Sequence, residues 1–329
     1  MKKIMNKATD VVEEMLSGMD YIHHDLIHQL ENNDVIVRNK KQPGKVALIS
    51  GGGSGHEPAH AGFVGEGMLA GAVCGAVFTS PTPDQILAAI KACDEGAGVF
   101  LIIKNYSGDI MNFEMAQDMA EMEGISVSSV IVDDDIAVED SLYTQGKRGV
   151  AGTVLVHKIL GYAAQTGKNL DEIKALADKV VQNIHTVGVA LSGATVPEVG
   201  KPGFILAEDE IEFGVGIHGE PGYRKEKLVS SYELAEELTS KLLQSFEYNN
   251  NDQFGLLING LGSTPLMEQY IFANDVAKLL AKSHVNIEFK KLGNYMTSID
   301  MAGISLTLIK LDDQQWLEAL KAPVNTIAW

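Results

Sequence analysis

Residues 45–58 read KVALISGGGSGHEP, an apolar run followed by a cluster of glycines. A short, continuous apolar run bounded by glycines is typical of a buried strand. Two further runs of this kind, at 67–78 and 98–104, each lead through a turn into a helical pattern. Strands that read as continuous apolar runs and alternate with helices indicate a parallel sheet covered on both faces.

The pattern changes in the second half of the chain. Residues 148–184 read as helical, and strand-like segments follow at 186–191, 204–206 and 211–216. A length of 329 residues fits about two domains at roughly 150 residues each. We therefore predict an α/β fold with two α/β domains. Residues 1–184 would form the first, with a mainly parallel sheet and helices on both faces, and residues 185–329 a smaller, mixed α/β domain.

The composition excludes several classes of partner. The chain has 26 Lys and Arg against 44 Asp and Glu, a formal net charge of −18. Such a surface would be repelled by nucleic acids and by anionic membranes. Cys74 and Cys93 lie in apolar stretches without metal-ligand spacing, which indicates buried thiols in a reducing compartment. No apolar segment approaches the roughly 20 residues that span a bilayer, so we predict a cytoplasmic protein with no membrane or nucleic-acid partner.

Three loops are expected to gather at one edge of the predicted sheet. In parallel sheets, ligands bind beyond the carboxyl ends of the strands, and the loops at 51–58, 79–83 and 104–109 all leave those ends. The glycines at 51–55 would let backbone N–H groups approach a ligand, although a tight turn explains them about as well. The sequence of a Walker A loop or a dinucleotide fingerprint is absent. His56, directly after the glycines, is a candidate ligand-binding residue, with a structural role as the alternative.

Two other places carry candidate site residues. Lys104 and Asp109 flank one strand-to-helix loop, where they could bind hydroxyls and a phosphate or simply pair as ions. Asp109 could also be the N-cap of the following helix. His218, in the sequence IHGEPG at 217–222, is either a functional histidine or a residue of a turn. A carboxylate partner could fix its tautomer, and glutamates at 208, 210 and 212 lie nearby in sequence.

The remaining patterns have simpler explanations. No cluster of histidine, cysteine or carboxylate side chains has convincing metal-ligand spacing, so we predict no metal site. The run Asp133-Asp134-Asp135 is interpreted as the solvated end of a strand. Four methionines recur at helical spacing, which indicates the packed face of a helix; they are Met111, Met115, Met119 and Met122.

Seven segments follow one another in order along the chain, at 51–58, 60–63, 78–85, 104–113, 148–153, 188–191 and 216–222. Together they resemble the substrate-binding domain of the dihydroxyacetone kinase family. The resemblance extends from about residue 8 to Trp329, and the length is similar to that of the family's free-standing dihydroxyacetone-binding subunit.

The resemblance implies roles for individual residues. His218 matches the histidine that adds through a ring nitrogen to the keto carbon of dihydroxyacetone, giving a hemiaminal. Asp109 and His56 match the positions that do acid–base work on the hydroxyl that receives the phosphoryl group. The implied substrate-binding set is Gly53, Ser54, Gly55, His56, Ser80, Lys104, Asp109 and His218.

The resemblance also implies partners. No cofactor is expected on this chain, and ADP or ATP with Mg²⁺ is expected on a DhaL-type nucleotide-binding subunit. That subunit would be recharged by a DhaM-type phosphotransferase-system protein, with phosphoenolpyruvate or ATP left open as the ultimate donor. The implied protein is a homodimeric phosphotransferase with an alcohol acceptor. The alternative is a noncatalytic, dihydroxyacetone-binding paralogue that acts as coactivator of a transcription regulator, and a nucleotide-dependent dehydrogenase is a remoter possibility.

Overall fold

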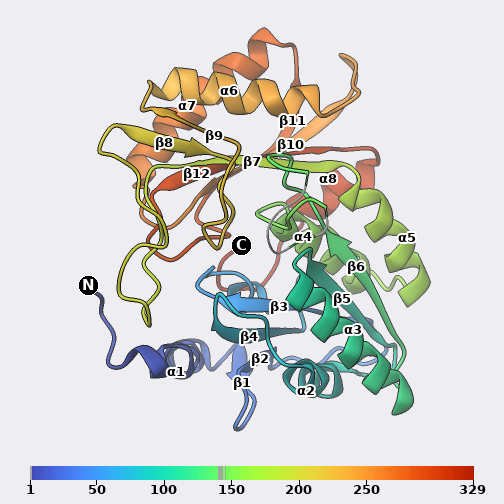
Figure 1. Ribbon diagram of the computed structural model, residues 1–329. Coiled ribbons are helices and arrows are strands. Elements are labelled where there is room, and N and C mark those ends of the chain that lie inside the picture. Colours follow the sequence, from blue (N-terminus) through green and yellow to red (C-terminus); the bar gives the residue numbers. More distant parts are fainter. Residues whose placement is uncertain (1, 140–143, 145) are drawn as a thin grey trace.

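The computed structural model describes residues 2–139, 144 and 146–329. Its first sheet has six strands in the order β1-β2-β4-β3-β5-β6 (Figure 1). These are β1 (Ile27–Gln29), β2 (Val35–Arg38), β3 (Ala47–Ser54), β4 (Gly71–Val77), β5 (Val99–Lys104) and β6 (Val127–Val132). Strands β4, β3, β5 and β6 are parallel, and the β1–β2 hairpin pairs antiparallel at the edge beside β4. The prediction of a mainly parallel first sheet is confirmed.

Helices cover both faces of this sheet. One face packs against α2 (Pro83–Cys93) and α3 (Ser107–Met122). The other packs against α4 (Thr153–Gln165) and α5 (Leu170–Val181), with α1 (Val11–His23) at its rim. Short 3₁₀ turns form at η1 (Ala8–Asp10) and η2 (Ala61–Phe63). Helix α2 begins directly after Thr82, because Thr82 forms a capping box with Gln85 and proline occupies the first turn.

The second sheet also has six strands, in the order β11-β10-β12-β7-β8-β9. These are β7 (Ile184–Ala190), β8 (Glu210–Phe213), β9 (Arg224–Lys227), β10 (Gln253–Gly260), β11 (Asn286–Gly293) and β12 (Gly303–Lys310). Its β10–β11 pair is parallel and the other pairs are antiparallel. Helices α6 (Ser231–Gln244) and α7 (Leu266–Lys282) cover the face that points away from the first sheet (Figure 1). The predicted mixed α/β character is confirmed.

The end of the chain returns to the first half. Helix α8 (Gln314–Lys321) packs on α4, and Lys158 donates a hydrogen bond to the carbonyl of Ala319. Further on, Asn325 N donates to Glu66 O at 3.0 Å and Ala328 N donates to Gly62 O at 3.0 Å. We propose that the boundary between the two domains lies between residues 184 and 185. In this division, the last residues of the chain attach the second domain to the first.

Strand β3 is longer than its apolar run. It continues through the glycines to Ser54, because Gly51, Gly52 and Gly53 stay in register with β4. The segment 204–206, predicted as a strand, has no strand structure. None of the helices in the described part of the chain is long and apolar enough to cross a membrane.

The interpretation of Asp133 to Asp135 as a solvated strand end was wrong for two of the three residues. Asp134 is buried, and its carboxylate accepts from Val150 N at 2.7 Å and from Gly152 N at 2.8 Å. Asp135 is also buried and pairs with Arg148, with Nη2 2.6 Å from Oδ2. These aspartates therefore anchor the segment that leads into α4.

Three of the four methionines of α3 lie outside its packed face, and only Met119 packs against the core as predicted. Met111, Met115 and Met122 are exposed by 58%, 50% and 81%. The face toward the sheet is instead made by smaller or aromatic residues, among them Phe113 and Ala116. A helical spacing identifies one face of a helix, but it does not say whether that face is the buried one.

Candidate active site

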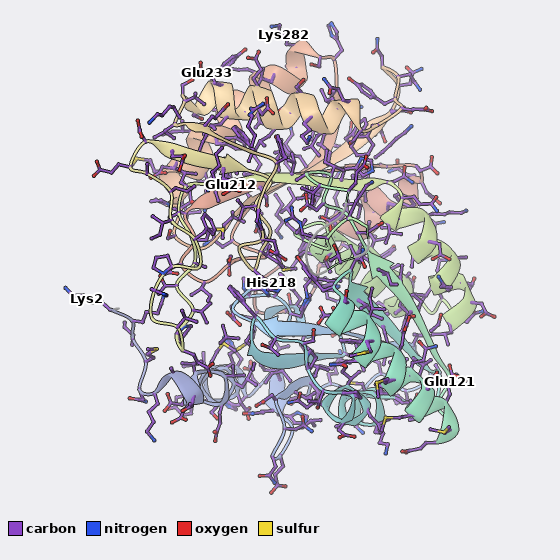
Figure 2. The ribbon with its side chains drawn as sticks, viewed as in Figure 1. Lys2, Glu121, Glu212, His218, Glu233 and Lys282 are labelled. Atoms are coloured by element: carbon purple, nitrogen blue, oxygen red, sulfur yellow. The ribbon has the colours of Figure 1, made fainter. Side chains whose placement is uncertain are left out.

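A cavity of about 490 Å³ opens where the strand-end loops of the first sheet meet a turn of the second half. Its lining includes four of the predicted site residues, namely Gly53, Ser80, Asp109 and His218, together with Phe78, Tyr106, Ser107 and Gly108. Figure 2 shows His218 in the middle of the molecule, between the two sheets. The structure therefore brings residues 165 positions apart in sequence, from 53 to 218, to one cavity.

Aromatic rings hold the imidazole of His218. Tyr106 meets it edge-on with ring centroids 4.6 Å apart, and Phe78 does the same at 5.2 Å. His56 forms the third wall at 4.8 Å. The His218 side chain is 17% exposed, so one part of the ring still faces the cavity.

His56 is in direct contact with His218 and is fully buried. Its Nδ1 is 2.7 Å from the carbonyl oxygen of Thr297, which can only accept, so Nδ1 carries the proton. Its Nε2 is 3.0 Å from Nε2 of His218. Burial lowers the pKa of His56 well below its ordinary value, and the nearby His218 and Lys104 add to the effect. The protonated form of His56 is therefore disfavoured, and it would lose its proton readily.

Polar groups from three parts of the first half meet next to the cavity, and two of them, Ser80 and Asp109, line it. Lys104 ends β5 with its ammonium buried, 3.4 Å from Oδ2 of Asp109 and 3.3 Å from Gly51 O. Asp109 lies in the first turn of α3, where the helix dipole favours a carboxylate. Its Oδ1 accepts a hydrogen bond from the hydroxyl of Ser80. The N-cap of α3 is Tyr106, so the alternative role for Asp109 as the N-cap was wrong.

A glycine is required beside this ammonium. Gly52 has φ +152°, a conformation that L side chains rarely adopt, and a Cβ built on it would lie 2.4 Å from Lys104 Nζ. The glycine cluster thus admits the Lys104 side chain against the backbone of β3.

Four predicted binding residues lie outside the cavity lining: His56 and Lys104, which pack against lining residues, and Ser54 and Gly55. The hydroxyl of Ser54 donates to Gly75 O at 2.7 Å, which fastens β3 to β4. Gly55 N donates to Oε1 of Glu57 at 2.9 Å, and Gly55 O accepts from Ile299 N at 2.8 Å. Their groups are engaged in holding the loop, while Gly53 reaches the cavity itself.

The carboxylate partner of His218 is Glu220, not a glutamate at 208, 210 or 212. Oε1 of Glu220 is 3.1 Å from Nδ1 of His218, and Oε2 accepts from His218 N at 2.9 Å. Glu212 instead accepts from Gly222 N at 2.9 Å, and Figure 2 shows it on β8, away from His218. A tight turn, in which Gly219 N donates to Gly216 O, folds Glu220 back beneath the histidine.

Other contributors were missed from the sequence. Thr297, in the loop before β12, accepts from His56 and also donates from its hydroxyl to Glu57 O at 2.8 Å. Tyr106 and Phe78 were seen only as parts of motifs. The signal for Glu220 was available, because a glutamate two residues after a His-Gly turn can reach back to the ring, whereas Thr297 had no local signal at all.

Comparison with known proteins decides the family. The model of the Dak1 domain matches residues 17–328. The chain belongs to the Dak1 family. This Dak1 chain is 67% identical over 328 residues to the dihydroxyacetone-binding subunit DhaK of the PTS-dependent dihydroxyacetone kinase of Lactococcus lactis subsp. lactis, covering 100% of this chain and 99% of that protein. The resemblance to the dihydroxyacetone kinase family is thereby confirmed.

A relative of a different kind is also similar. The DhaKLM operon coactivator DhaQ of L. lactis is 46% identical over 329 residues, covering 99% of the Dak1 chain and 100% of that protein. A solved structure of a dihydroxyacetone kinase operon co-activator has a TM-score of 0.92 at 46% identity and covers 96% of this chain and 98% of that one. The dihydroxyacetone kinase of C. freundii has a TM-score of 0.91 at 37% identity, and this chain spans 60% of its length. The same fold therefore occurs in kinases and in a coactivator.

A second histidine pair in the Dak1 chain makes its stability depend on pH. His60 Nδ1 lies 2.8 Å from His157 Nε2, and both rings are buried. Burial lowers the pKa of His157 to about 3, with Lys104 contributing, and lowers that of His60 well below its ordinary value. In the unfolded chain each would titrate near about 6.5. The stabilisation by these neutral rings is therefore complete above about pH 6.5 and is lost as the pH falls toward 3.

We expect acidification from about pH 7 to about pH 5.5 to lower the free energy of unfolding by about 1 kcal/mol through His157 alone. Urea unfolding at the two pH values measures this loss. In a His157→Gln variant the loss should be smaller by about the same amount, since that proton-linked contribution is gone. Equal losses in wild type and variant would show that His157 does not titrate in this way.

Proposed function

We propose that this chain binds dihydroxyacetone covalently and presents it for phosphorylation, as the dihydroxyacetone-binding subunit of a dihydroxyacetone kinase. The observation that carries the proposal is that His218, Ser80 and Asp109 line one small cavity, with Lys104 buried 3.4 Å from Asp109. His218 offers an imidazole nucleophile for a carbonyl carbon, and the Ser80–Asp109–Lys104 group offers charged and hydroxyl groups for the arms of the same small molecule.

Covalent binding suits such a substrate. A three-carbon ketone offers little surface, so its noncovalent affinity would be poor. Addition of His218 to the keto carbon fixes the molecule and leaves both hydroxymethyl arms free. Glycerol carries similar hydroxyls but no carbonyl, and would therefore be rejected.

The hydrogen bonds of the two histidines suggest where the protons go when His218 adds to the keto carbon. Nδ1 of His56 donates to Thr297 O and Nδ1 of His218 donates to Glu220, so a hydrogen bond between the two Nε2 atoms needs one further proton. In the proposed step, His56 takes this proton as the Nε2 lone pair of His218 bonds to the keto carbon. The carbonyl π electrons move to oxygen, and His56 returns the proton to that oxygen, which gives the hemiaminal hydroxyl. Charge and protons are conserved, with one positive charge before and after.

The Ser80–Asp109–Lys104 group would handle the phosphoryl acceptor. Asp109 accepts from Ser80 and lies 3.4 Å from Lys104, so it is oriented and paired when the substrate arrives. A hydroxymethyl arm beside Asp109 could transfer its proton there as the hydroxyl oxygen attacks phosphorus. Phosphoryl transfer depends mainly on such positioning and on stabilisation of charge.

The phosphoryl group would come from a partner. We propose that a DhaL-type subunit carries the nucleotide and Mg²⁺ and docks over the cavity, and that a DhaM-type protein of the phosphotransferase system recharges it. The similarity to the PTS-dependent L. lactis subunit supports phosphoenolpyruvate as the ultimate donor. We also propose that the chain functions as a homodimer.

The second candidate function is that of a coactivator, favoured by the 46% identity to DhaQ. A coactivator needs to bind dihydroxyacetone but has no use for a carboxylate at the acceptor hydroxyl. The intact Ser80–Asp109–Lys104 group therefore supports the kinase.

Reconstitution distinguishes the two functions. The chain is mixed with a nucleotide-loaded DhaL-type subunit, a DhaM-type protein, the phosphotransferase enzymes and phosphoenolpyruvate, and dihydroxyacetone phosphate is measured. We expect product from dihydroxyacetone and none from glycerol, and none when this chain is left out. Adduct formation without any product would support the coactivator instead.

A further inference from the structure

Glu220 is the best-buried carboxylate in contact with His218. Its side chain is 1% exposed, yet both of its oxygens have partners on that one residue, the ring Nδ1 and the backbone N–H. Burial opposes its ionised form, but the hydrogen bond and charge of His218, with Arg148 further away, hold its pKa below the ordinary value. Burying an ionised carboxylate costs free energy unless opposite charges and hydrogen bonds compensate for the lost hydration. The presence of Glu220 at this position therefore needs an explanation.

The compensation comes from a buried arginine. Arg148 is fully buried and is fixed by Asp135, with Nε 2.8 Å from Oδ2, and by Gly214, whose carbonyl accepts from Nη2 at 2.6 Å. Its third nitrogen, Nη1, has no hydrogen-bond partner among the residues that the structure describes, and it lies near the side of the turn that carries Glu220. Burial lowers the pKa of Arg148, but Asp135 outweighs this and keeps the guanidinium charged.

Gly216 leaves the room for this arrangement. A Cβ at Gly216 would lie 2.1 Å from Oε2 of Glu220 and 2.8 Å from Nη1 of Arg148. Any side chain there would force the carboxylate away from His218. The turn 216–220 is thus shaped around Glu220, and not only around the histidine.

We propose that Glu220, backed by Arg148 and Asp135, is the positioning residue that makes Nε2 of His218 the attacking nitrogen and stabilises the charged ring of the adduct. This inference rests on the proposed function and deepens it. Because Glu220 accepts from Nδ1, the proton is held there and the lone pair is left to Nε2, on the side of His56.

The electron count explains why a carboxylate is suited to this place. When the Nε2 lone pair bonds to the keto carbon, the ring keeps its Nδ1 proton and becomes a substituted imidazolium with one positive charge. The carbonyl oxygen takes the π electrons and the proton, so no other group neutralises the ring. Glu220 then accepts a charge-assisted hydrogen bond, which is about twice as strong as a neutral one. When the carbon–nitrogen bond breaks, the same charge leaves the ring.

The test compares three variants in adduct formation with dihydroxyacetone, measured by native mass spectrometry over a range of ligand concentrations. Glu220→Gln keeps the shape and removes the charge, and we expect the adduct to weaken by about 10- to 100-fold. Glu220→Asp restores the charge one methylene further away and should recover part of the affinity. Glu212→Gln is the matched control, since Glu212 is a buried glutamate of the same region without contact to His218, and should bind as wild type does.

A spectroscopic signature separates this role from a merely structural one. In the wild-type adduct, the Nδ1–H proton bonded to Glu220 should give a ring N–H resonance far downfield, which disappears in Glu220→Gln and persists in Glu212→Gln. Equal adduct affinity in wild type and Glu220→Gln, or a downfield proton that survives the change, would overturn the inference and leave the proposed function standing. If the wild type formed no adduct, both would fall together.

Discussion

Replacing His218 by alanine is expected to abolish the covalent complex with dihydroxyacetone. Native mass spectrometry should show the wild type shifted by the mass of one ligand and the variant unshifted. We also expect kcat/KM in the reconstituted system to fall by about 10³-fold or more, because a small ketone held by a few noncovalent contacts is poorly oriented. The physical reason is that His218 lines the cavity from the second half of the chain and that, in the proposed step, its Nε2 bonds to the keto carbon.

A histidine elsewhere in the second half provides the control. His185 is bonded to Ser245 and stacked on Phe246, outside the cavity lining. His185→Ala should retain the adduct and turnover, apart from any loss of stability. A mass shift of equal size in His218→Ala would assign the bond to another nucleophile.

Asp109→Asn should separate binding from chemistry. The adduct should persist, because Asp109 contacts Ser80 and Lys104 and not His218. Turnover should fall by about 10²- to 10⁴-fold, the usual contribution of a positioned general base. Native mass spectrometry and the rate of dihydroxyacetone phosphate formation, measured on the same preparations, test the two halves of this expectation.

An exposed aspartate of the same helix is the matched control. Asp118 lies on α3 and away from the cavity, so Asp118→Asn should leave both adduct and turnover unchanged. If turnover were undiminished in Asp109→Asn, this carboxylate would have no part in the mechanism. If the variant lost the adduct together with turnover, Asp109 would be a binding residue.

The place of the cavity follows from local patterns in the sequence. Apolar runs ending in glycines or turns locate the strands of a parallel sheet, and geometry puts the loops after β3, β4 and β5 at one edge. The nearness of Lys104 and Asp109 follows as well, since a strand end and the first turn of the next helix are adjacent. These features depend on one or two neighbouring elements, and local patterns in the sequence are enough to predict them.

The errors arise where contacts join distant parts of the chain. The antiparallel order of the second sheet brings the 216–222 turn over the first sheet, and the loop at Thr297 onto His56. No spacing in the sequence encodes either contact. Asp134 and Asp135 looked solvated because their partners, such as Arg148, come from the segment that folds back over them. Glu220 is the exception, because its contact with His218 is local, and it was overlooked in favour of the glutamates at 208, 210 and 212.

The central claim is a reversible bond between Nε2 of His218 and the keto carbon of dihydroxyacetone. Its most direct test is the electron density of crystals of this chain soaked in dihydroxyacetone. The account predicts continuous density from Nε2 to a tetrahedral central carbon, with a hydroxymethyl arm beside Asp109. A planar ligand at van der Waals distance from the ring, or one bound outside this cavity, would contradict it.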